Sequence, residues 1–299
     1  MYSQIVKFNA NESFSFIRAR PDGGGIIDTN VKGLYGHHVI IESESVVIDS
    51  GDLDCEFSIP FDNNTEANEA EIIIYNLSYN TTNQLNLGRK ITVKAGYGED
   101  IGVIFSGEIS DKKVRNEDTD RVIKLKAIDG AGLRECEVEV SYCAGNTAQA
   151  ILYDLCARLG FPIATFQPVR DYTFDKDVNV DGSLMDEIEK YAGICGVSAY
   201  VCKGMVYIQP LSASGLDSFS LSVETGLLSA EEYEEDKKNG DFEDTYRGWS
   251  LEMLMNHRIQ TGTKIELTSN RANGNYYVQE GEHSYDGTNM ITKVIAVEG

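Results

Sequence analysis

The alternating pattern of residues 71–129 constrains the fold more than any other feature of the chain. Ile91, Val93 and Ala95 alternate with polar residues, and residues 121–129 repeat this period of two. Such a period is typical of β-strands with one buried face and one solvated face. Turn-forming Gly and Asn residues separate the apolar runs, so the segment is predicted to be a meander of antiparallel strands. A sheet of this kind must close on itself, surround a ligand or pair with other copies of the chain.

The middle of the chain changes to a helical pattern. Asn146 is predicted to cap a helix, with Gln149 reaching back to it, and a second helix is predicted to start after a Ser183 cap. Lys203 and Gly204 lie between two apolar runs and predict a tight hairpin turn. The apolar face of the first helix is predicted to contain Ala148, Ile151, Leu152, Leu155, Cys156 and Leu159.

These patterns predict a mainly β protein with an α+β insertion. Residues 1–140 are expected to form a first β-barrel domain, and residues 211–299 a second β-barrel domain. The insertion module of residues 141–210, with a helix, a second helix and a hairpin, would lie between the two tube-like barrels. At 299 residues and 41% hydrophobic content, the chain can fill cores of this number and size.

The chain is strongly acidic, with 48 Asp and Glu residues against 26 Lys and Arg residues and a net charge of −22. This balance argues against a nucleic-acid-binding protein, which needs clustered cations. The acidic residues are densest in the second β region, where like charges repel one another. Residues 231–244 are therefore predicted to be a solvated acidic loop with at most a short helical turn, and a docking surface for a basic partner is the alternative.

The cysteine spacing and the N-terminal sequence indicate the cellular compartment in which the protein is made. The six cysteines include no Cys-x-x-Cys pair, so they are expected to be reduced core residues rather than a zinc site or a disulfide framework. The N-terminus lacks a signal-peptide pattern, and no run approaches the roughly 18 apolar residues of a membrane helix. We therefore expect the protein to be cytoplasmic when it is made.

Catalytic candidates are few. His37 and His38 are adjacent and would point to opposite faces of a strand, and His257 and His283 are isolated in the sequence. The common hydrolase, metalloprotease and nucleotide-binding motifs do not occur. Acidic pairs such as Asp52 with Asp54 arise by chance in so acidic a chain, so no catalytic residue, no metal site and no cofactor is predicted.

Short motifs follow one another along the chain at 88–97, 104–109 and 127–130, then at 141–150, and finally at 225–228, 262–267, 274–278 and His283. In this order they resemble the baseplate hub proteins of contractile phage tails and R-type bacteriocins, the phage late control protein D-like or tail hub family. The first group matches the first barrel of that family, the second its insertion helix, and the third its second barrel.

The resemblance implies a homotrimeric ring in which each chain gives two tube-like barrels. Such a ring would adapt the six-fold tail tube above it to a three-fold central spike below it. The implied partners are further copies of the chain, the central spike protein, the tail tube protein, other baseplate proteins and the tape measure protein, without membrane binding. The resemblance also implies assembly in the bacterial cytoplasm and a final place in the baseplate of a virion or contractile particle. A trimer would carry 3 × −22 = −66 charges, part of which we expect on the channel wall, where they would repel DNA.

Strands 91–97 and 263–268 are the segments expected at subunit interfaces, because open sheet edges can pair with a neighbouring chain. The acidic segment 231–244 is the predicted contact with the tail tube or with a neighbouring hub chain. The interface residues predicted on the two strands are Ile91, Val93, Ala95, Tyr97, Ile265 and Leu267.

Two other functions compete with a structural hub. A receptor- or carbohydrate-binding tail protein would use exposed aromatic side chains, for example Tyr276 and Tyr277. A peptidoglycan hydrolase would use a pair of acidic residues. No lysozyme-like or peptidase-like module is recognised in the chain, so activity that cuts the cell wall is expected to be absent or to belong to a partner.

Overall fold

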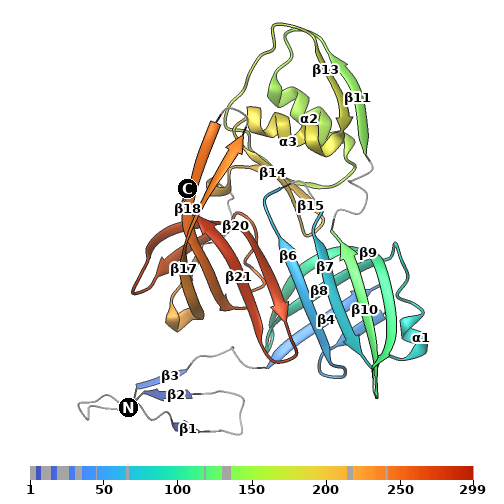
Figure 1. Ribbon diagram of the computed structural model, residues 1–299, viewed down its shortest axis with the longest axis vertical. Helices are drawn as coiled ribbons and strands as arrows, with labels where there is room; N and C mark the ends of the chain where they lie inside the picture. The colour runs from blue at the N-terminus through green and yellow to red at the C-terminus, as the bar shows by residue number, and fades with distance from the viewer. Residues whose placement is uncertain are drawn as a thin grey trace.

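The computed structural model describes residues 5–7, 15–18, 27–30, 36–44, 46–64, 67–117, 119–129, 136–213, 218–239 and 242–298. Strands predominate, and a smaller unit with helices α2 and α3 lies at one end of the molecule (Figure 1). The prediction of a mainly β protein is confirmed. No helix in the described part of the chain is both long and apolar enough to cross a membrane.

One large sheet contains most of the strands. Its order is β17-β18-β21-β20-β6-β7-β10-β9-β8-β4-β5, and β19 joins it through β20 and carries β16. All its pairs are antiparallel except β16 with β19. The strands are β4 (His37–Ser43), β5 (Val46–Asp49), β6 (Cys55–Phe61), β7 (Glu69–Tyr75), β8 (Lys90–Tyr97), β9 (Asp100–Glu117), β10 (Asp120–Ile128), β16 (Phe219–Leu221), β17 (Leu227–Asn239), β18 (Phe242–Leu254), β19 (Lys264–Thr268), β20 (Asn273–Tyr285) and β21 (Met290–Val297).

A separate three-stranded antiparallel sheet precedes the large one in sequence. It consists of β1 (Ile5–Lys7), β2 (Ser15–Arg18) and β3 (Ile27–Asn30), with β2 in the centre. Figure 1 shows it at the lower end of the molecule, beside the N-terminus.

The alternation in residues 71–129 gives half-buried strands, as predicted. Ile72, Ile74, Ile123 and Leu125 are fully buried in one apolar core, and the residues between them are half-exposed or exposed. The strand order differs from a simple meander, because β7 pairs with β10 and not with β8. The short helix α1 (Tyr79–Thr82) lies between β7 and β8, and Ile74 and Ile123 are opposite each other in the β7–β10 pair.

The insertion contains the two predicted helices, α2 (Ala148–Arg158) and α3 (Leu184–Ile194). All six residues of the predicted apolar face of α2 are buried. The predicted Asn146 cap is wrong by one residue: the Thr147 hydroxyl accepts from the Ala150 amide, while the Asn146 side chain donates to the Cys143 carbonyl. Ser183 caps α3 as predicted, accepting from the Asp186 amide at 3.4 Å.

Two small sheets accompany these helices. β11 (Glu137–Tyr142) pairs with β13 (Val178–Ser183), and β15 (Met205–Gln209) lies between β12 (Ile163–Phe166) and β14 (Ser198–Cys202). The predicted hairpin is confirmed, with Lys203 and Gly204 at φ of +53° and +75°. Positive φ at both turn residues matches the right-handed twist of the flanking strands. Two short 3₁₀ turns, η1 (Leu211–Ala213) and η2 (Val223–Thr225), follow.

The acidic segment 231–244 is not a loop. Its described residues form the outer parts of β17 and β18, a long antiparallel hairpin, with residues 240 and 241 outside the described part of the chain. The register sets Lys237 opposite Asp244 and Lys238 opposite Glu243. Among the described side chains of this hairpin, Arg247 of β18 pairs with Glu234 of β17 at 3.1 Å, and an opposite-charge pair across two strands offsets part of the self-repulsion that a count of charges suggests.

A seam between β6 and β20 joins the two β regions into one sheet. Ile59 of β6 lies opposite His283 of β20 in this antiparallel pair. The strand order ends at β5 and β17, and no strand pair among the described residues closes it into a ring. The two-barrel layout and the domain limits 1–140, 141–210 and 211–299 therefore stay predictions.

Candidate interaction surfaces and the junction pocket

The six residues predicted at subunit interfaces lie in the cores of the chain itself. Each is at most 6% exposed: Ile91, Val93, Ala95, Tyr97, Ile265 and Leu267. β8 is hydrogen-bonded to β4 and β9, and β19 to β16 and β20. The interpretation of these strands as open sheet edges is therefore wrong, because both sides of each strand are already paired. Contact of these residues with another subunit stays a prediction.

Two free edges of the large sheet are β5 and β17, which end the main strand order with one neighbour each, and the three-residue β16 on the side branch also pairs with one strand, β19. β5 is uncharged except for Asp49, and its Val47 side chain is 67% exposed. β17 is acidic, with exposed Glu231 and Glu232 and with Glu234 paired to Arg247 of β18 at 3.1 Å. The two edges thus differ in character, one apolar and one anionic.

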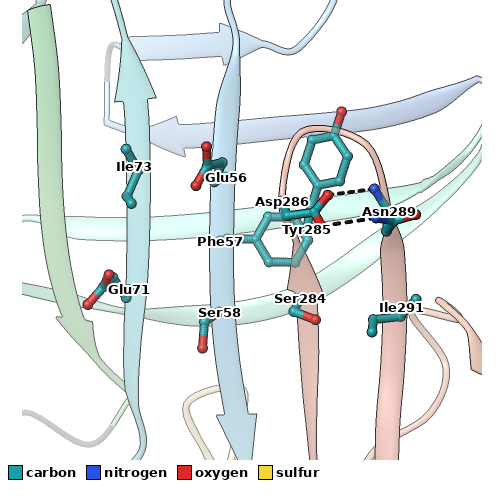
Figure 2. Close-up of a pocket in the computed structure, with 10 residues that line it drawn as sticks. All are labelled: Glu56, Phe57, Ser58, Glu71, Ile73, Ser284, Tyr285, Asp286, Asn289 and Ile291. Carbon is teal, nitrogen blue, oxygen red and sulfur yellow. Dashed lines mark hydrogen bonds between the residues drawn. The ribbon is translucent and has the colours of Figure 1, made fainter. Parts of the chain in front are cut away.

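The seam between the two β regions carries a hollow of about 240 Å³ (Figure 2). Glu56 and Glu71 lie on its β6 and β7 side, and Asp286 and Asn289 on its β20–β21 side. Each carboxylate has a donor from the chain: the Tyr75 hydroxyl donates to Glu56 at 2.7 Å, Lys124 pairs with Glu71, and the backbone and side chain of Asn289 donate to Asp286. The hydrogen bonds from Asn289 lower the pKa of Asp286 to about 2. The described residues contain no group of three or more side chains placed to bind a metal ion.

Residues 255–263, which we call the junction loop, lie between β18 and β19 of the second β region. They contact the first β region, which contains β9, and the insertion, which contains β14. Asp100 of β9 accepts two hydrogen bonds from the Arg258 guanidinium, at 2.7 and 2.9 Å, and one from His257 at 3.1 Å. The hydrogen bonds from Arg258 and from His257 hold the pKa of Asp100 well below its usual range. The Thr261 hydroxyl donates to the Asp62 carbonyl, and the Tyr200 hydroxyl of β14 donates to the Thr261 carbonyl. The loop therefore fixes the insertion and the second β region against the first.

The hairpin turn of the insertion packs beside this loop. The Lys203 ammonium donates to the His257 carbonyl at 3.2 Å, and a Cβ placed on Gly204 would lie 3.6 Å from the Ser106 carbonyl of β9. The turn, β9, β16 and the junction loop surround a cavity of about 300 Å³, which we call the junction pocket. Its lining residues are Val103, Lys203, Ser218, Phe219, His257, Arg258, Ile259, Gln260 and Thr263.

A neutral histidine is buried behind the junction loop. His283 is 1% exposed, with Nε2 at 3.1 Å from the Ile259 carbonyl and Nδ1 at 2.8 Å from the Thr292 hydroxyl. A carbonyl can only accept, so Nε2 carries the proton and Nδ1 accepts from Thr292. Burial, together with the nearby Lys203 charge, lowers the pKa of His283 to about 3.

A buried carboxyl lies at the end of β10. Asp129 is 6% exposed and accepts from the Asn68 amide at 2.8 Å and from the Asn68 side chain at 3.4 Å. Desolvation outweighs these two bonds and, with a smaller contribution from the Asp62 charge, raises the pKa of Asp129 to about 7. Asp129 and His283 both lie in the motifs that resemble the hub family, but no local pattern predicted their burial, because it depends on strand pairs between distant segments.

The other candidate residues have local structural partners. His38 binds Asp49 at 3.0 Å, whereas the ring of His37 packs against Tyr97 and Tyr285, so the two adjacent histidines are not brought together on one ligand. Tyr276, a candidate for an exposed binding aromatic, is 8% exposed and belongs to the core of the second β region.

The close approach of β9 to the junction loop can be tested at Gly102. A Cβ there would lie 2.1 Å from Nδ1 of His257. We expect Gly102→Ala to push this ring away from Asp100 and to lower the free energy of unfolding by about 1–3 kcal/mol, the usual cost of overpacking. Urea unfolding measures the change.

Gly193→Ala is the matched control, because Gly193 lies in α3 and a Cβ there would have no neighbour within 4 Å. This variant should be neutral or more stable than the wild type, since Ala favours helix over Gly. Equal losses for the two variants would show that the contact between β9 and the junction loop has no special role in stability.

Solved structures with the same fold are phage tail proteins and related secretion proteins. A 43 kDa tail protein of prophage MuSo2 from Shewanella oneidensis has a TM-score of 0.63 and 10% identity, covering 88% of this chain and 98% of its own. A tail protein from Neisseria meningitidis MC58 has a TM-score of 0.61 and 12% identity, covering 88% and 97%. An E. coli component of the type VI secretion system has a TM-score of 0.57 and 10% identity, covering 87% and 76%. These likenesses define the fold as that of tail proteins.

The sequence itself decides the family. The pattern of the family described as Baseplate hub gp41 matches residues 38–287, which is most of the chain. The chain therefore belongs to the baseplate hub gp41 family, and it is a structural protein of a phage tail baseplate. No curated protein sequence matches it. The predicted resemblance to baseplate hubs is confirmed.

Proposed function

We propose that the chain forms a homotrimeric ring that adapts a six-fold tail tube to a three-fold central spike. The observation that carries this proposal is the open sheet whose main strand order ends in two unlike free edges, β5 and β17. A free edge presents unpaired backbone donors and acceptors that a neighbouring chain can complete. Unlike edges favour a head-to-tail contact, which generates a ring where the rotation closes.

Charge decides which edges would meet. Two β17 edges placed side by side would bring acidic residues such as Glu231 and Glu232 of both chains together, which is unfavourable. The edge of β5 carries Val46, Val47 and Ile48 and adds no such repulsion. The ring contact is therefore β5 of one chain against β17 of the next, which replaces the interface first predicted on strands 91–97 and 263–268.

The remaining partners follow from this role. The central spike protein, the tail tube protein, other baseplate proteins and the tape measure protein are the neighbours of such a ring. The acidic outer part of the β17–β18 hairpin is the proposed contact with the tube or an adjacent hub chain. Each barrel of the proposed two-barrel layout would be completed within the ring, and part of the negative charge would line the channel.

The mass of the purified chain in solution tests the ring directly. Light scattering over a range of concentration and salt should give about three times 33.1 kDa. Val47→Asp should weaken assembly about ten-fold or more, because it sets a carboxylate against the acidic β17 edge of the next chain. Val47→Lys should leave assembly intact or strengthen it.

Leu87→Asp is the control, since Leu87 is 62% exposed in the segment before β8 and lies on neither free edge. A monomeric wild type that stays monomeric with tube and spike proteins would refute the ring. If the wild type and both Val47 variants form trimers with the same concentration dependence, the ring proposal stands. The proposal that β5 is the edge at the ring contact is then wrong.

A further inference from the structure

The junction pocket has the composition of an anion site in an otherwise anionic molecule. Its polar lining includes Lys203, Arg258 and His257, while Val103 and Phe219 give it apolar walls. Among the described residues that line it there is no Asp or Glu. Apolar walls keep water away and strengthen any charge interaction inside.

The three basic side chains differ in whether they already have an acidic partner. Arg258 and His257 share the Asp100 carboxylate, as described above. The Lys203 ammonium donates to a backbone carbonyl, and no carboxylate of the described residues is paired with it. Other lysines of the chain do have acidic partners: Lys94, Lys113, Lys124, Lys126, Lys190, Lys264 and Lys293.

An ammonium group that is removed from water has an unfavourable free energy unless a nearby anion compensates for the lost hydration. Burial accordingly lowers the pKa of Lys203, and the charge of Lys203 contributes to the lowered pKa of His283 behind the loop. The first effect reflects the desolvation of Lys203, and the second shows that its charge acts on the groups around the pocket. The site is also held in place, because the Lys203 turn is bonded to the junction loop and packs beside β9.

We propose that the junction pocket binds an oxyanion, a carboxylate or phosphate group, with Lys203 as its counter-charge and Arg258 at its rim. The volume of about 300 Å³ accepts a small free oxyanion or one acidic side chain of a peptide. The pocket lies where the insertion and both β regions meet, so an occupant would tie these parts together. The site itself is independent of the ring, because none of its lining residues lies on β5 or β17.

Calorimetric titration of the full chain at constant ionic strength tests the site. The probes are inorganic phosphate and a peptide with the acidic sequence of residues 229–236. Both should bind saturably to the wild type, and Lys203→Met should weaken binding about ten-fold or more, the effect of losing a charged hydrogen-bond partner. Lys203→Arg should retain binding. Tighter binding of the peptide would identify an acidic segment as the occupant, and tighter binding of phosphate a free oxyanion.

Lys190→Met is the matched control, because Lys190 is a surface lysine of α3 that already pairs with Glu187. Its affinity should stay within about two-fold of the wild type, as for a surface charge distant from the site. Absence of saturable binding to the wild type, or equal affinity for Lys203→Met, would overturn the proposal.

A second measurement needs no variant and covers the case in which Lys203→Met does not fold. Acylation of lysines in the wild-type chain, read by peptide mass spectrometry, should be slowed at Lys203 by phosphate or the peptide and unchanged at Lys190. Equal protection at both lysines, or at neither, would also overturn the proposal.

Discussion

Asp129→Asn is expected to stabilise the protein relative to the wild type as the pH rises from about 4 to about 7. The folded state keeps the Asp129 proton up to a pKa of about 7, whereas the unfolded chain releases it near 3.8. Between these values the folded state binds more protons, so stability falls as the pH rises. A difference of about three pKa units corresponds to about 4 kcal/mol. Asparagine carries no charge at any of these pH values, and its side-chain oxygen can still accept from the Asn68 amide.

Urea unfolding at several pH values between 4 and 8 measures this effect as the stability of the variant minus that of the wild type. The difference should grow by about 4 kcal/mol over the range and then level off above pH 7. Asp52→Asn, at an exposed position, should give a small and nearly constant difference. A constant difference for Asp129→Asn as well would mean that Asp129 is ionised in the folded protein without cost.

His283→Gln is expected to remove an acid sensitivity of similar size and opposite sign. The folded pKa of His283 is lowered to about 3, while the unfolded value is 6.5, so the unfolded chain binds the extra proton between these values. Stability should therefore fall as the pH drops from 6.5 toward 3, by up to about 5 kcal/mol for three to four pKa units. The charges that face this ring, Lys203 and His257, oppose its protonation further.

The test follows the free energy of unfolding from pH 7 down to pH 3.5. Gln can still donate to the Ile259 carbonyl, so the variant should lose about 1–3 kcal/mol at pH 7 and show a shallower decline on acidification than the wild type. His38→Gln is the control, because His38 lies in a surface pair with Asp49. If the free energy of unfolding of His283→Gln falls with decreasing pH as steeply as that of the wild type, groups other than His283 cause the acid sensitivity.

The contributions of Asp129 and His283 together predict how the stability of the wild type varies with pH. Between about pH 4 and 6.5 the His283 and Asp129 contributions have opposite slopes and comparable size, so the wild type should vary less with pH in this window than either variant. In Asp129→Asn, the loss of stability on acidification that His283 causes should become visible. In His283→Gln, the loss of stability toward neutral pH that Asp129 causes should become visible.

The local elements could be predicted from the sequence, because short-range patterns determine them. The alternation that includes Ile91 and Val93 gave buried strands, since a period of two sets one face of a strand against the core. Ser183 gave the start of α3, and Lys203 with Gly204 gave a tight turn, because each depends on hydrogen bonds and φ values within a few residues. The order of short motifs was also enough to indicate the hub family.

Strand partners and charge neighbours were decided only by the tertiary structure. The prediction of a loop at 231–244 was wrong because it counted charges and could not see the opposite strand, with which this segment forms the antiparallel β17–β18 pair. The prediction that β8 and β19 are open sheet edges was wrong, because an alternating pattern is the same for an edge strand and an inner one. Asp100, Lys203 and His257 meet across distances in sequence that no local pattern spans. Periodicity fixes which face of a strand is buried, whereas long-range pairing and desolvation determine which edges stay free and which charges become costly.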